Sequence, residues 1–362
     1  MKIALLGAGH IGQRIARLFH GSGHYQVTVF DQNADSLAKL AAEGIGTHVV
    51  GDKLESVAPA LRGHEVMVNA LPYHLAIPAA RMALEARCHY FDLTEDVAAT
   101  KEIKHMAAGA RTAFMPQCGL APGFIGIVAH HMAQSFDSLH DVKMRVGALP
   151  EFPTNALKYN LTWSVDGLIN EYCHPCEAIR DGAAIEALPL EGLEHFSLDG
   201  IEYEAFNTSG GLGTLCETLA GRVRNLDYKT VRYPGHRDLM QFLLRDLQLH
   251  SDQKTLKDMM RRSMPATMQD VVLVFVTVSG MKNGTLLQEV FARKIFAERD
   301  NGHSLSAIQI TTAAGICAAV DLFREGNLPQ AGFIAQEEVK LPDFLANRFG
   351  NAYEKSRQVE SI

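Results

Sequence analysis

The glycine-rich segment at the beginning of the chain constrains the fold more than any other feature. An apolar run, Lys2–Leu6, precedes the sequence Gly7-Ala8-Gly9-His10-Ile11-Gly12, and a helix-like stretch from Gln13 to Phe19 follows it. A second apolar run then ends in Asp31, close to the spacing of about 20 residues typical of such motifs. A strand, a glycine turn, a helix and a second strand ending in an acid predict a dinucleotide-binding βαβ unit.

Each position of this motif has a physical role in cofactor binding. Gly7 permits the tight turn, Gly9 lets a pyrophosphate approach the backbone, and Gly12 lets the helix pack against the strand. His10 and Ile11 open the helix, whose first N–H groups and partial positive charge attract phosphates. The alternative is a glycine-rich turn of an α/β protein that binds no cofactor.

Asp31 indicates which dinucleotide is preferred. Its carboxylate is expected to accept hydrogen bonds from the adenosine ribose hydroxyls, and it would repel a 2′-phosphate. The next residues, Gln32 and Asn33, carry no positive charge that would offset this repulsion. The sequence therefore predicts NAD as the cofactor, with NADP less favoured.

Strands and helices continue to alternate up to Met115, which predicts a parallel sheet with helices on both faces. The expected strands are Thr47–Val50, Glu65–Ala70, Cys88–Leu93 and Thr112–Met115, and the expected helices are Ser36–Ala42, Leu54–Leu61, His74–Glu85 and Asp96–Ala108. We therefore expect residues 1–122 to form a Rossmann NAD(P)-binding domain.

The pattern changes after a helix predicted at Phe124–Gln134. The expected strands are now Asp141–Gly147, Leu157–Trp163, Asp270–Ser279 and Leu286–Phe296, and Asn283-Gly284 is a strong hairpin-turn signal between the last two. Residues 123–303 are thus predicted to form an α+β substrate and dimerisation domain built on a largely antiparallel sheet. We expect residues 304–350, beginning with a helix at Ser304–Arg324, to form C-terminal helices that pack back towards the first domain.

Composition excludes several function classes. The chain is 47% hydrophobic with a net charge of −7, which argues against nucleic acid or an anionic membrane as a partner. No apolar run reaches the ~18 residues of a membrane span, and a strand directly follows Met1 where a signal peptide would lie. Six sparse cysteines indicate reduced thiols, so we expect a cytoplasmic protein. Cys173-His174-Pro175-Cys176 lacks a second ligand pair, and no metal is expected.

Three loops of the first domain are candidates for contact with the substrate, because the nicotinamide lies near the carboxyl ends of the strands. They are Ala70-Leu71-Pro72-Tyr73, Asp92–Asp96 and Cys118–Gly123. A helix N-cap would account for Thr94 or Asp96 without any functional role. Burial as a small residue is favoured for Cys118 over a nucleophilic role, because no base is marked beside it.

Two polar stretches of the second domain also suggest a binding site. Phe206–Thr214 is rich in glycine and hydroxyl groups, and Tyr228–His236 combines an arginine, a histidine and two tyrosines. Arg232 is suited to a two-pronged grip on a carboxylate, and His236 to proton exchange near neutral pH. The alternatives are a structural ion pair for Arg232 and a helix-capping role for His236.

At these residues the chain resembles the saccharopine dehydrogenase family, in particular its lysine 6-dehydrogenase-like bacterial branch. The resemblance covers nearly the whole chain. It rests on Ala70–Tyr73, Gly119–Gly123, Leu161–Ser164, Gly167–Tyr172, Glu204–Gly211 and Arg232–His236.

The resemblance implies an enzyme that oxidises the C–N bond at the ε-carbon of lysine or saccharopine and passes hydride to NAD(P). It also implies a homodimer whose second domain closes the substrate cleft. The implied cofactor contacts include Ala70, Leu71 and Pro72. The implied substrate contacts are Tyr73, Asp96, Asn207, Thr208, Ser209, Gly210 and Arg232.

The ε-nitrogen must lose a proton before hydride departs, and its free pKa is about 10.4. His236 and Lys158 are the candidate bases. A generous polar lining favours saccharopine, with glutamate as a product. The alternatives are a lysine 6-dehydrogenase that releases ammonia, an amino-acid or polyamine reductase such as a carboxynorspermidine-forming enzyme, and a non-catalytic NAD(H)-sensing protein.

Overall fold

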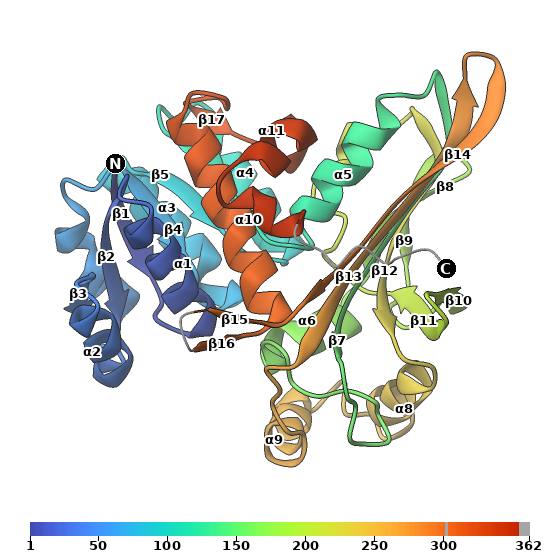
Figure 1. Ribbon diagram of the computed structural model, residues 1–362, viewed down its shortest axis with the longest axis horizontal. Helices are drawn as coiled ribbons and strands as arrows, with labels where there is room; N and C mark the ends of the chain where they lie inside the picture. The colour runs from blue at the N-terminus through green and yellow to red at the C-terminus, as the bar shows by residue number, and fades with distance from the viewer. Residues whose placement is uncertain (301–302, 355–362) are drawn as a thin grey trace. The chain divides into compact units, whose positions relative to one another are not determined.

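The computed structural model describes residues 1–300 and 303–354 (Figure 1). The chain divides into two compact units. Unit 1 consists of Met1–Phe124 together with Thr311–Glu354, and unit 2 of Ile125–Ile310. Unit 1 is therefore built from two separate segments of the chain, and the second of them lies in the region predicted to form C-terminal helices.

Unit 1 contains a parallel sheet of seven strands in the order β17-β6-β5-β4-β1-β2-β3. The strands are β1 (Lys2–Leu6), β2 (Gln26–Asp31), β3 (Gly46–Val49), β4 (Val66–Asn69), β5 (His89–Asp92), β6 (Ala113–Met115) and β17 (Gly332–Phe333). Strand β4 is buried throughout and β1 is buried after its first residue, as expected for the centre of a parallel sheet. The predicted Rossmann sheet is confirmed, and β17 is a strand that the sequence did not predict.

The helices of unit 1 follow the expected alternation with one difference. The α-helices are α1 (His10–Gly21), α2 (Ala34–Ala42), α3 (Ala76–Ala86), α4 (Val97–Ala107), α10 (Ala307–Arg324, which begins in unit 2) and α11 (Leu341–Ala346). Short 3₁₀ turns are η2 (Tyr73–Leu75), η4 (Gln336–Glu338) and η5 (Gly350–Tyr353). The predicted α-helix at Leu54–Leu61 is a 3₁₀ helix, η1, and it contains Pro59, which lacks the N–H that an α-helix needs.

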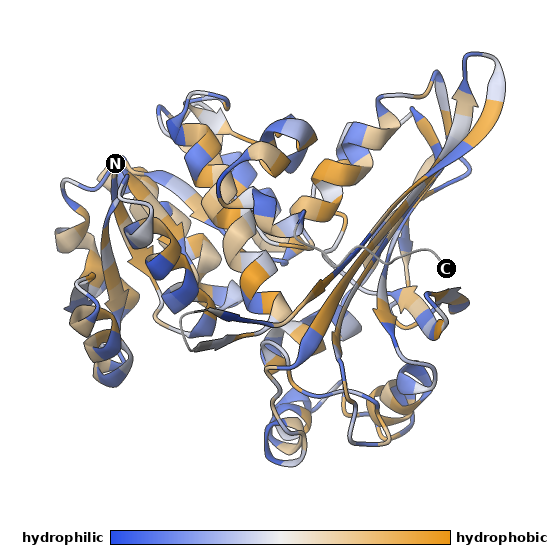
Figure 2. Cartoon of the chain, viewed as in Figure 1, coloured by the Kyte–Doolittle hydropathy of each residue, from blue (hydrophilic) through white to orange (hydrophobic). Residues whose placement is uncertain are grey.

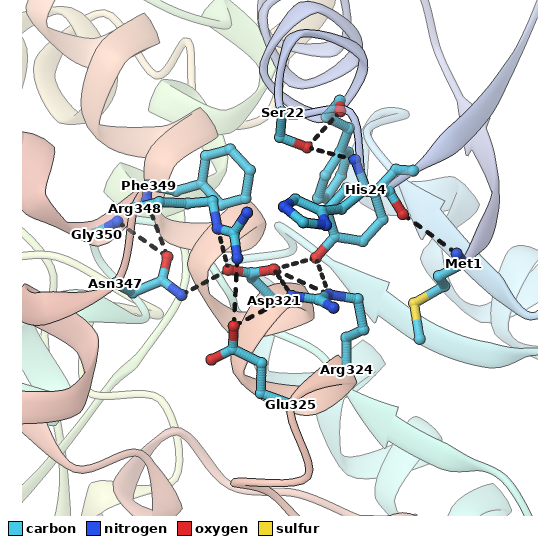
Figure 3. Close-up of polar contacts among 12 residues, drawn as sticks. Met1, Ser22, His24, Asp321, Arg324, Glu325, Asn347, Arg348, Phe349 and Gly350 are labelled. Atoms are coloured by element: carbon cyan, nitrogen blue, oxygen red, sulfur yellow. Dashed lines mark hydrogen bonds and ion pairs between the residues drawn. The ribbon is translucent and has the colours of Figure 1, made fainter.

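Helix α10 is held in unit 1 by a buried carboxylate (Figure 3). Asp321 accepts hydrogen bonds from the Tyr25 hydroxyl and from Asn347 Nδ2, the latter at 2.9 Å. Arg324 and Arg348 form ion pairs with it at 3.1 and 3.0 Å. Among the described residues α10 is the one helix long and apolar enough to cross a membrane, but 89% of it is buried inside the protein. Its apolar composition is therefore explained by its burial as a core helix.

Unit 2 is built on a mixed sheet of eight strands. The strands are β7 (Ser138–Pro150), β8 (Cys176–Arg180), β9 (Ala183–Ala187), β10 (Glu194–Leu198), β11 (Ile201–Asn207), β12 (Val223–Arg232), β13 (Asp270–Lys282) and β14 (Thr285–Phe296). The main order is β10-β11-β12-β7-β13-β14, and every pairing is antiparallel except that of β12 with β7. Figure 2 shows apolar residues concentrated along the long strands β7 and β13.

The β13–β14 hairpin confirms the predicted turn. Asn283 and Gly284 have φ values of 52° and 76°, the two positive values that a two-residue type I′ turn requires. The helices of unit 2 are α5 (Phe124–Ala133), α6 (Val165–Cys173), α7 (Leu215–Thr218), α8 (His236–Gln241), which runs into a π-helical turn η3 (Phe242–Asp246), and α9 (Gln253–Ser263).

The strand predicted at Leu157–Trp163 is wrong. This segment is irregular, and its regular pairing is limited to one isolated bridge between Leu161 and Ala266. The side chain of Asn155 donates to the Tyr159 carbonyl oxygen at 2.6 Å, where a neighbouring strand would otherwise supply the partner. Tyr159 packs into an apolar cluster with residues of α6, α8 and α9. The aromatic and branched residues that suggested a strand therefore serve this cluster.

Candidate functional site

Two glycines of the first motif are required by packing within unit 1. Gly7 has a φ of 101°, and a Cβ placed on it would lie 2.9 Å from the carbonyl oxygen of Ala70. A Cβ on Gly12 would lie 2.0 Å from the carbonyl oxygen of Gly7, well inside the contact distance. Both positions therefore exclude a side chain, as the motif predicts.

Gly9 differs from its two neighbours, because a Cβ there would meet no atom within 4 Å. It is exposed and forms the N-cap of α1 with extended backbone and no side-chain cap. His10 is exposed and Ile11 half-buried in the first turn that follows. Open space in front of a helix N-terminus suits a pyrophosphate, so the residues present fit a dinucleotide.

Asp31 lies at the end of β2, beside the glycine loop. Its Oδ2 accepts a hydrogen bond from the Ala8 N–H at 2.5 Å, and its Oδ1 accepts one from the Asn33 N–H at 2.7 Å. The side chain is half-buried. The carboxylate is thus held against the loop, where the ribose of a bound dinucleotide is expected.

The loop after β4 lies against the glycine motif. Leu71 Cδ2 would be 3.4 Å from a Cβ on Gly7, so Ala70 and Leu71 adjoin the loop, while Pro72 is exposed. Asn69 shapes this loop, because its Oδ1 accepts a hydrogen bond from the Leu71 N–H at 3.1 Å. The sequence analysis missed Asn69, although a polar residue that ends an apolar strand was a usable signal. Tyr73 begins the next turn, with its ring against that of His74.

Asp92 is a buried carboxylate at the end of β5. It accepts hydrogen bonds from the Tyr90 hydroxyl at 2.8 Å, the Thr94 N–H at 2.9 Å and the Gln117 N–H at 3.0 Å. Burial raises the pKa of Asp92 to about 6, and the three hydrogen bonds oppose that rise. Asp92 therefore ties the ends of β5 and β6 together.

The neighbouring acids have separate roles. Asp96 is the N-cap of α4 and accepts from the Ala99 N–H at 2.7 Å, so capping accounts for it without contact to a substrate. Burial, with the Asp96 and Asp92 carboxylates nearby, raises the pKa of Glu95 to about 7. Glu95 lies in a loop that was predicted to contact the substrate, but it was not among the predicted site residues.

Burial also raises the pKa of the Cys118 thiol, as expected for an inert cysteine.

In unit 2 the chain places Tyr159, Tyr172, Arg232 and His236 in one buried group, here called the Arg232 cluster. Arg232 is 2% exposed, and its Nε donates to the Tyr172 hydroxyl at 3.0 Å. Its guanidinium carbon lies 5.1 Å from the centre of the Tyr159 ring and 5.9 Å from that of Tyr172. Its nitrogens make no hydrogen bond to a carboxylate among the described residues, but the buried Glu171 carboxylate is near enough to help raise the pKa of Arg232. Glu171 is therefore the candidate partner for the structural pairing considered for Arg232.

His236 is wholly buried within this cluster. One ring nitrogen, Nδ1, lies 2.9 Å from the Leu157 carbonyl oxygen, and Nε2 lies 3.1 Å from the Tyr172 hydroxyl. Burial and, to a smaller extent, the positive charge of Arg232 lower the pKa of His236 to about 3, against the effect of the Leu157 hydrogen bond. Both nitrogens of a neutral ring are thus engaged, which speaks against the proton exchange expected of His236.

The capping role considered for His236 belongs to another residue. Helix α8 begins at His236 after Gly235, which has a φ of 97°. The buried carboxylate of Glu204 accepts from the Gly235 N–H at 2.8 Å and from the Arg237 N–H at 2.7 Å. Glu204 is on β11, some thirty residues earlier, so no local pattern marks it as the cap.

The structure gives the hydrogen-bond partners of Lys158 and of the side chains in the glycine-rich loop. Lys158 is exposed, and its Nζ donates to the Pro234 carbonyl oxygen at 3.0 Å. Asn207 Nδ2 donates to the Leu188 carbonyl oxygen at 3.3 Å, and Ser209 Oγ donates to that of Pro175 at 2.9 Å. Gly210 has a φ of 88° and makes the turn. Three of these polar side chains are therefore already used by the protein.

Thr208 is the exception in this loop. It is 2% exposed, and its Oγ1 has no hydrogen-bond partner among the described residues. The same holds for two other buried oxygens of unit 2, those of Asn160 and Asn170. The Tyr159 hydroxyl lies within hydrogen-bond reach of Thr162 and Trp163. Buried polar atoms without partners are rare in folded proteins and indicate a missing ligand or water. Arg232 Nη2, which makes no hydrogen bond among the described residues, suits a bound carboxylate.

Two family models match the chain and together cover most of it. Residues 3–114 match the saccharopine dehydrogenase NADP binding domain, and residues 119–350 match the saccharopine dehydrogenase C-terminal domain. Among solved structures, the apo saccharopine dehydrogenase (L-Glu forming) of Saccharomyces cerevisiae is similar with a TM-score of 0.79. It is 15% identical, and the match covers 96% of this chain and 98% of that one.

The curated relatives are much longer than this chain. The mitochondrial alpha-aminoadipic semialdehyde synthase of Bos taurus is 20% identical over 200 residues, and that of Mus musculus is 20% identical over 196. These matches include 52% and 51% of this chain, which spans only 21% of the length of either relative. The glycine motif, the seven-stranded parallel sheet and the second unit agree with both family models. The chain belongs to the saccharopine dehydrogenase family, and its first unit carries that family's nucleotide-binding domain.

Proposed function

We propose that this protein oxidises the C–N bond at the ε-carbon of a lysine-derived amino acid, with saccharopine as the substrate and glutamate as a product. The observation that carries this proposal is the buried Arg232, whose Nη2 makes no hydrogen bond among the described residues, although the nearby Glu171 carboxylate interacts with its charge. A guanidinium in this state is costly unless an anion pairs with it, and an amino acid supplies a carboxylate.

The cofactor side of the proposal rests on the loops of unit 1. A nicotinamide dinucleotide, when bound, supplies the hydride acceptor. The open space at Gly9 would admit its pyrophosphate, and Asp31 would bind its ribose, with NAD preferred over NADP. The loops after β1, β4 and β5 lie at one edge, because neighbouring strands of a parallel sheet end together. Residues of the β5 loop would therefore lie near the nicotinamide.

Glu95 is the group that we assign to proton transfer in place of His236 and Lys158. It follows β5 at this edge, and its pKa near 7 suits a base that works at neutral pH. In the ionised form it would take a proton from the substrate ammonium, whose nitrogen must be neutral before hydride leaves the neighbouring carbon. The imine that results is hydrolysed by water.

A second candidate is a lysine 6-dehydrogenase that releases ammonia, and one observation favours it. Saccharopine carries three carboxylates, whereas the Arg232 cluster holds a single guanidinium. Other buried cations of the sheet are already paired: Arg145 with Glu194 and Asp227, and Lys229 with Glu194. A substrate with one carboxylate would fit this distribution of charge.

The by-product of the reaction distinguishes the two candidates. Saccharopine and lysine give the same aldehyde, but the first releases glutamate and the second ammonia. We expect glutamate from saccharopine and NAD, with negligible turnover of lysine. Ammonia from lysine without reaction of saccharopine would select the second candidate. NADH binding without turnover of either amine would favour a sensor. The homodimer and the cytoplasmic location remain part of the proposal.

A further inference from the structure

The three nitrogens of the Arg232 guanidinium have different roles. Nε donates to the Tyr172 hydroxyl at 3.0 Å, and Nη1 donates to the Val231 carbonyl oxygen at 2.8 Å. Nη2 has no hydrogen bond within the part of the chain that the structure describes. The rings of Tyr159 and Tyr172 restrict the group further. Arg232 is therefore held in one orientation, with one nitrogen left to bind a ligand.

The hydroxyl of Tyr172 can accept from Arg232 only if its own hydrogen points elsewhere, and His236 determines that direction. A carbonyl oxygen only accepts, so His236 Nδ1 carries the hydrogen that it donates to Leu157. In the neutral ring Nε2 is then an acceptor, and the Tyr172 O–H donates to it. The Tyr172 oxygen is left to accept from Arg232 Nε. The donor and the acceptor of each hydrogen bond from Leu157 to Arg232 are therefore assigned.

The neutral state of His236 maintains this direction. A protonated ring would donate from both nitrogens, so the Tyr172 oxygen would have to accept from His236 and Arg232 together and its own hydrogen would lose the His236 acceptor. Burial and the adjacent Arg232 charge both oppose protonation of the ring. The neutral ring therefore favours this arrangement of hydrogen bonds from Leu157 to Arg232.

We infer that Tyr172 and His236 are positioning residues that hold Arg232 oriented in advance to bind the substrate carboxylate. The inference rests on the proposed function, because it assumes a substrate that carries a carboxylate. Without the Tyr172 hydroxyl, Arg232 Nε would be buried without a partner and the guanidinium could turn away from the ligand. Pre-orientation raises affinity because the flexible side chain is already ordered before binding.

The test measures binding of two probes that differ by one group. 6-Aminohexanoate has a carboxylate and a terminal amine, whereas cadaverine has two amines and no carboxylate. Binding is followed by the fluorescence of Trp163, the single tryptophan, which packs against the same apolar cluster as Tyr159 and Tyr172. We expect the wild type to bind 6-aminohexanoate and Arg232→Ala to lose tenfold or more of that affinity.

Tyr172→Phe is expected to weaken 6-aminohexanoate about tenfold and to leave cadaverine binding within about twofold. Tyr233→Phe is the matched control, because it removes a hydroxyl that donates to the Pro150 carbonyl oxygen at 3.0 Å, outside the chain of hydrogen bonds. It should change neither probe. Melting temperatures are measured for all variants, so a loss of folding is recognised directly.

Two substitutions of His236 provide a second and independent arm. His236→Gln places an amide oxygen near the position of Nε2 and can still accept from Tyr172. His236→Asn places its amide near Nδ1 and leaves the Tyr172 hydroxyl without this acceptor. We expect the glutamine variant to keep most of the affinity for 6-aminohexanoate and the asparagine variant to resemble Tyr172→Phe.

Equal effects of Tyr172→Phe on both probes, or no effect on either, would overturn the inference and make Tyr172 a purely structural residue. So would a wild type that binds neither probe. The proposed function fails separately: if no amine is oxidised but Tyr172→Phe still weakens only the carboxylate probe, the positioning role stands and the reaction assignment does not.

Discussion

Gly9 and Gly12 lie three residues apart, and the structure requires glycine at these positions for different reasons. A side chain on Gly12 would collide with the Gly7 carbonyl oxygen at 2.0 Å, whereas one on Gly9 would enter open space. Gly12→Ala should therefore lower the melting temperature. Gly9→Val should leave the melting temperature nearly unchanged and weaken NADH at least tenfold, as measured by NADH fluorescence. Full NADH affinity in Gly9→Val would place the pyrophosphate elsewhere.

Asp31 leads to a second prediction about a single residue. Its carboxylate would repel a 2′-phosphate, so we expect kcat/KM to be higher with NAD than with NADP, and Asp31→Ser to narrow the difference. Because Asp31 also accepts from the Ala8 and Asn33 N–H groups, the variant should lose some stability as well. The measurement is the ratio of the two cofactors in each enzyme. A wild type that uses NADP at least as well as NAD would refute the assignment.

Glu95 leads to a prediction about pH. A base with a pKa near 7 is active when ionised, so the rate should rise as pH increases through about 7. A second rise towards pH 10 should follow deprotonation of the substrate amine itself. Glu95→Gln should lower kcat and abolish the first rise only. If the rate of the Glu95→Gln enzyme still rose both near pH 7 and towards pH 10, Glu95 would not be the base.

At the scale of elements, the start of α10 shows how local and distant residues combine. Ser306 and Gln309 form a capping box, in which Ser306 Oγ accepts from the Gln309 N–H at 3.2 Å and Gln309 Oε1 accepts from the Ser306 N–H at 3.2 Å. The next two N–H groups, of Ala307 and Ile308, donate to the Asp270 carboxylate at 2.5 and 3.1 Å. Asp270 precedes the helix by more than thirty residues and is fully buried.

Burial raises the pKa of Asp270 to about 6, against the effect of these hydrogen bonds. The folded state therefore holds its proton more tightly than the unfolded state, so the free energy of unfolding should fall as pH rises from about 4 to about 6. Asp270→Asn keeps an oxygen acceptor but does not ionise. It should remove this fall, which thermal melts at pH 4 and pH 7 would measure. An unchanged pH dependence in the variant would contradict the assignment.

At the scale of the whole molecule, the network around Asp321 joins both chain segments of unit 1 (Figure 3). Burial alone would raise the pKa of Asp321, but the hydrogen bonds from Tyr25 and Asn347 and the charge of Arg348 outweigh it and leave that pKa low. Stability from this group is therefore present above about pH 4 and is lost as pH falls.

Asp321→Asn should destabilise the protein by about 1–3 kcal/mol at pH 7, since it removes the charged acceptor of several hydrogen bonds from a buried position, while Arg324 and Arg348 are partly exposed. The matched control is Glu43→Gln, which breaks a partly exposed pair with Arg17 and should cost less than about 1 kcal/mol. Urea unfolding measures both. Similar effects of the two substitutions would show that the Asp321 network contributes little to stability.

The sequence by itself determined the parts of this protein that depend on local rules. The βαβ unit follows from Gly7, Gly12 and the alternation of apolar runs, and the β13–β14 hairpin follows from Asn283-Gly284, because turn chemistry and side-chain period act over a few residues. The polar stretches of the second domain could be recognised for the same reason, since their composition is unusual.

Only the tertiary structure decided which of those polar groups remain available. Ser209 is hydrogen-bonded to Pro175, while Thr208 has no partner among the described residues. Glu204 caps α8 from a distant strand, and burial and the charge of Arg232 favour the neutral form of His236. The irregular path of Leu157–Trp163 was likewise decided by packing in its apolar cluster. Hydrogen-bond partners and desolvation come from residues tens of positions away, and no local pattern records them.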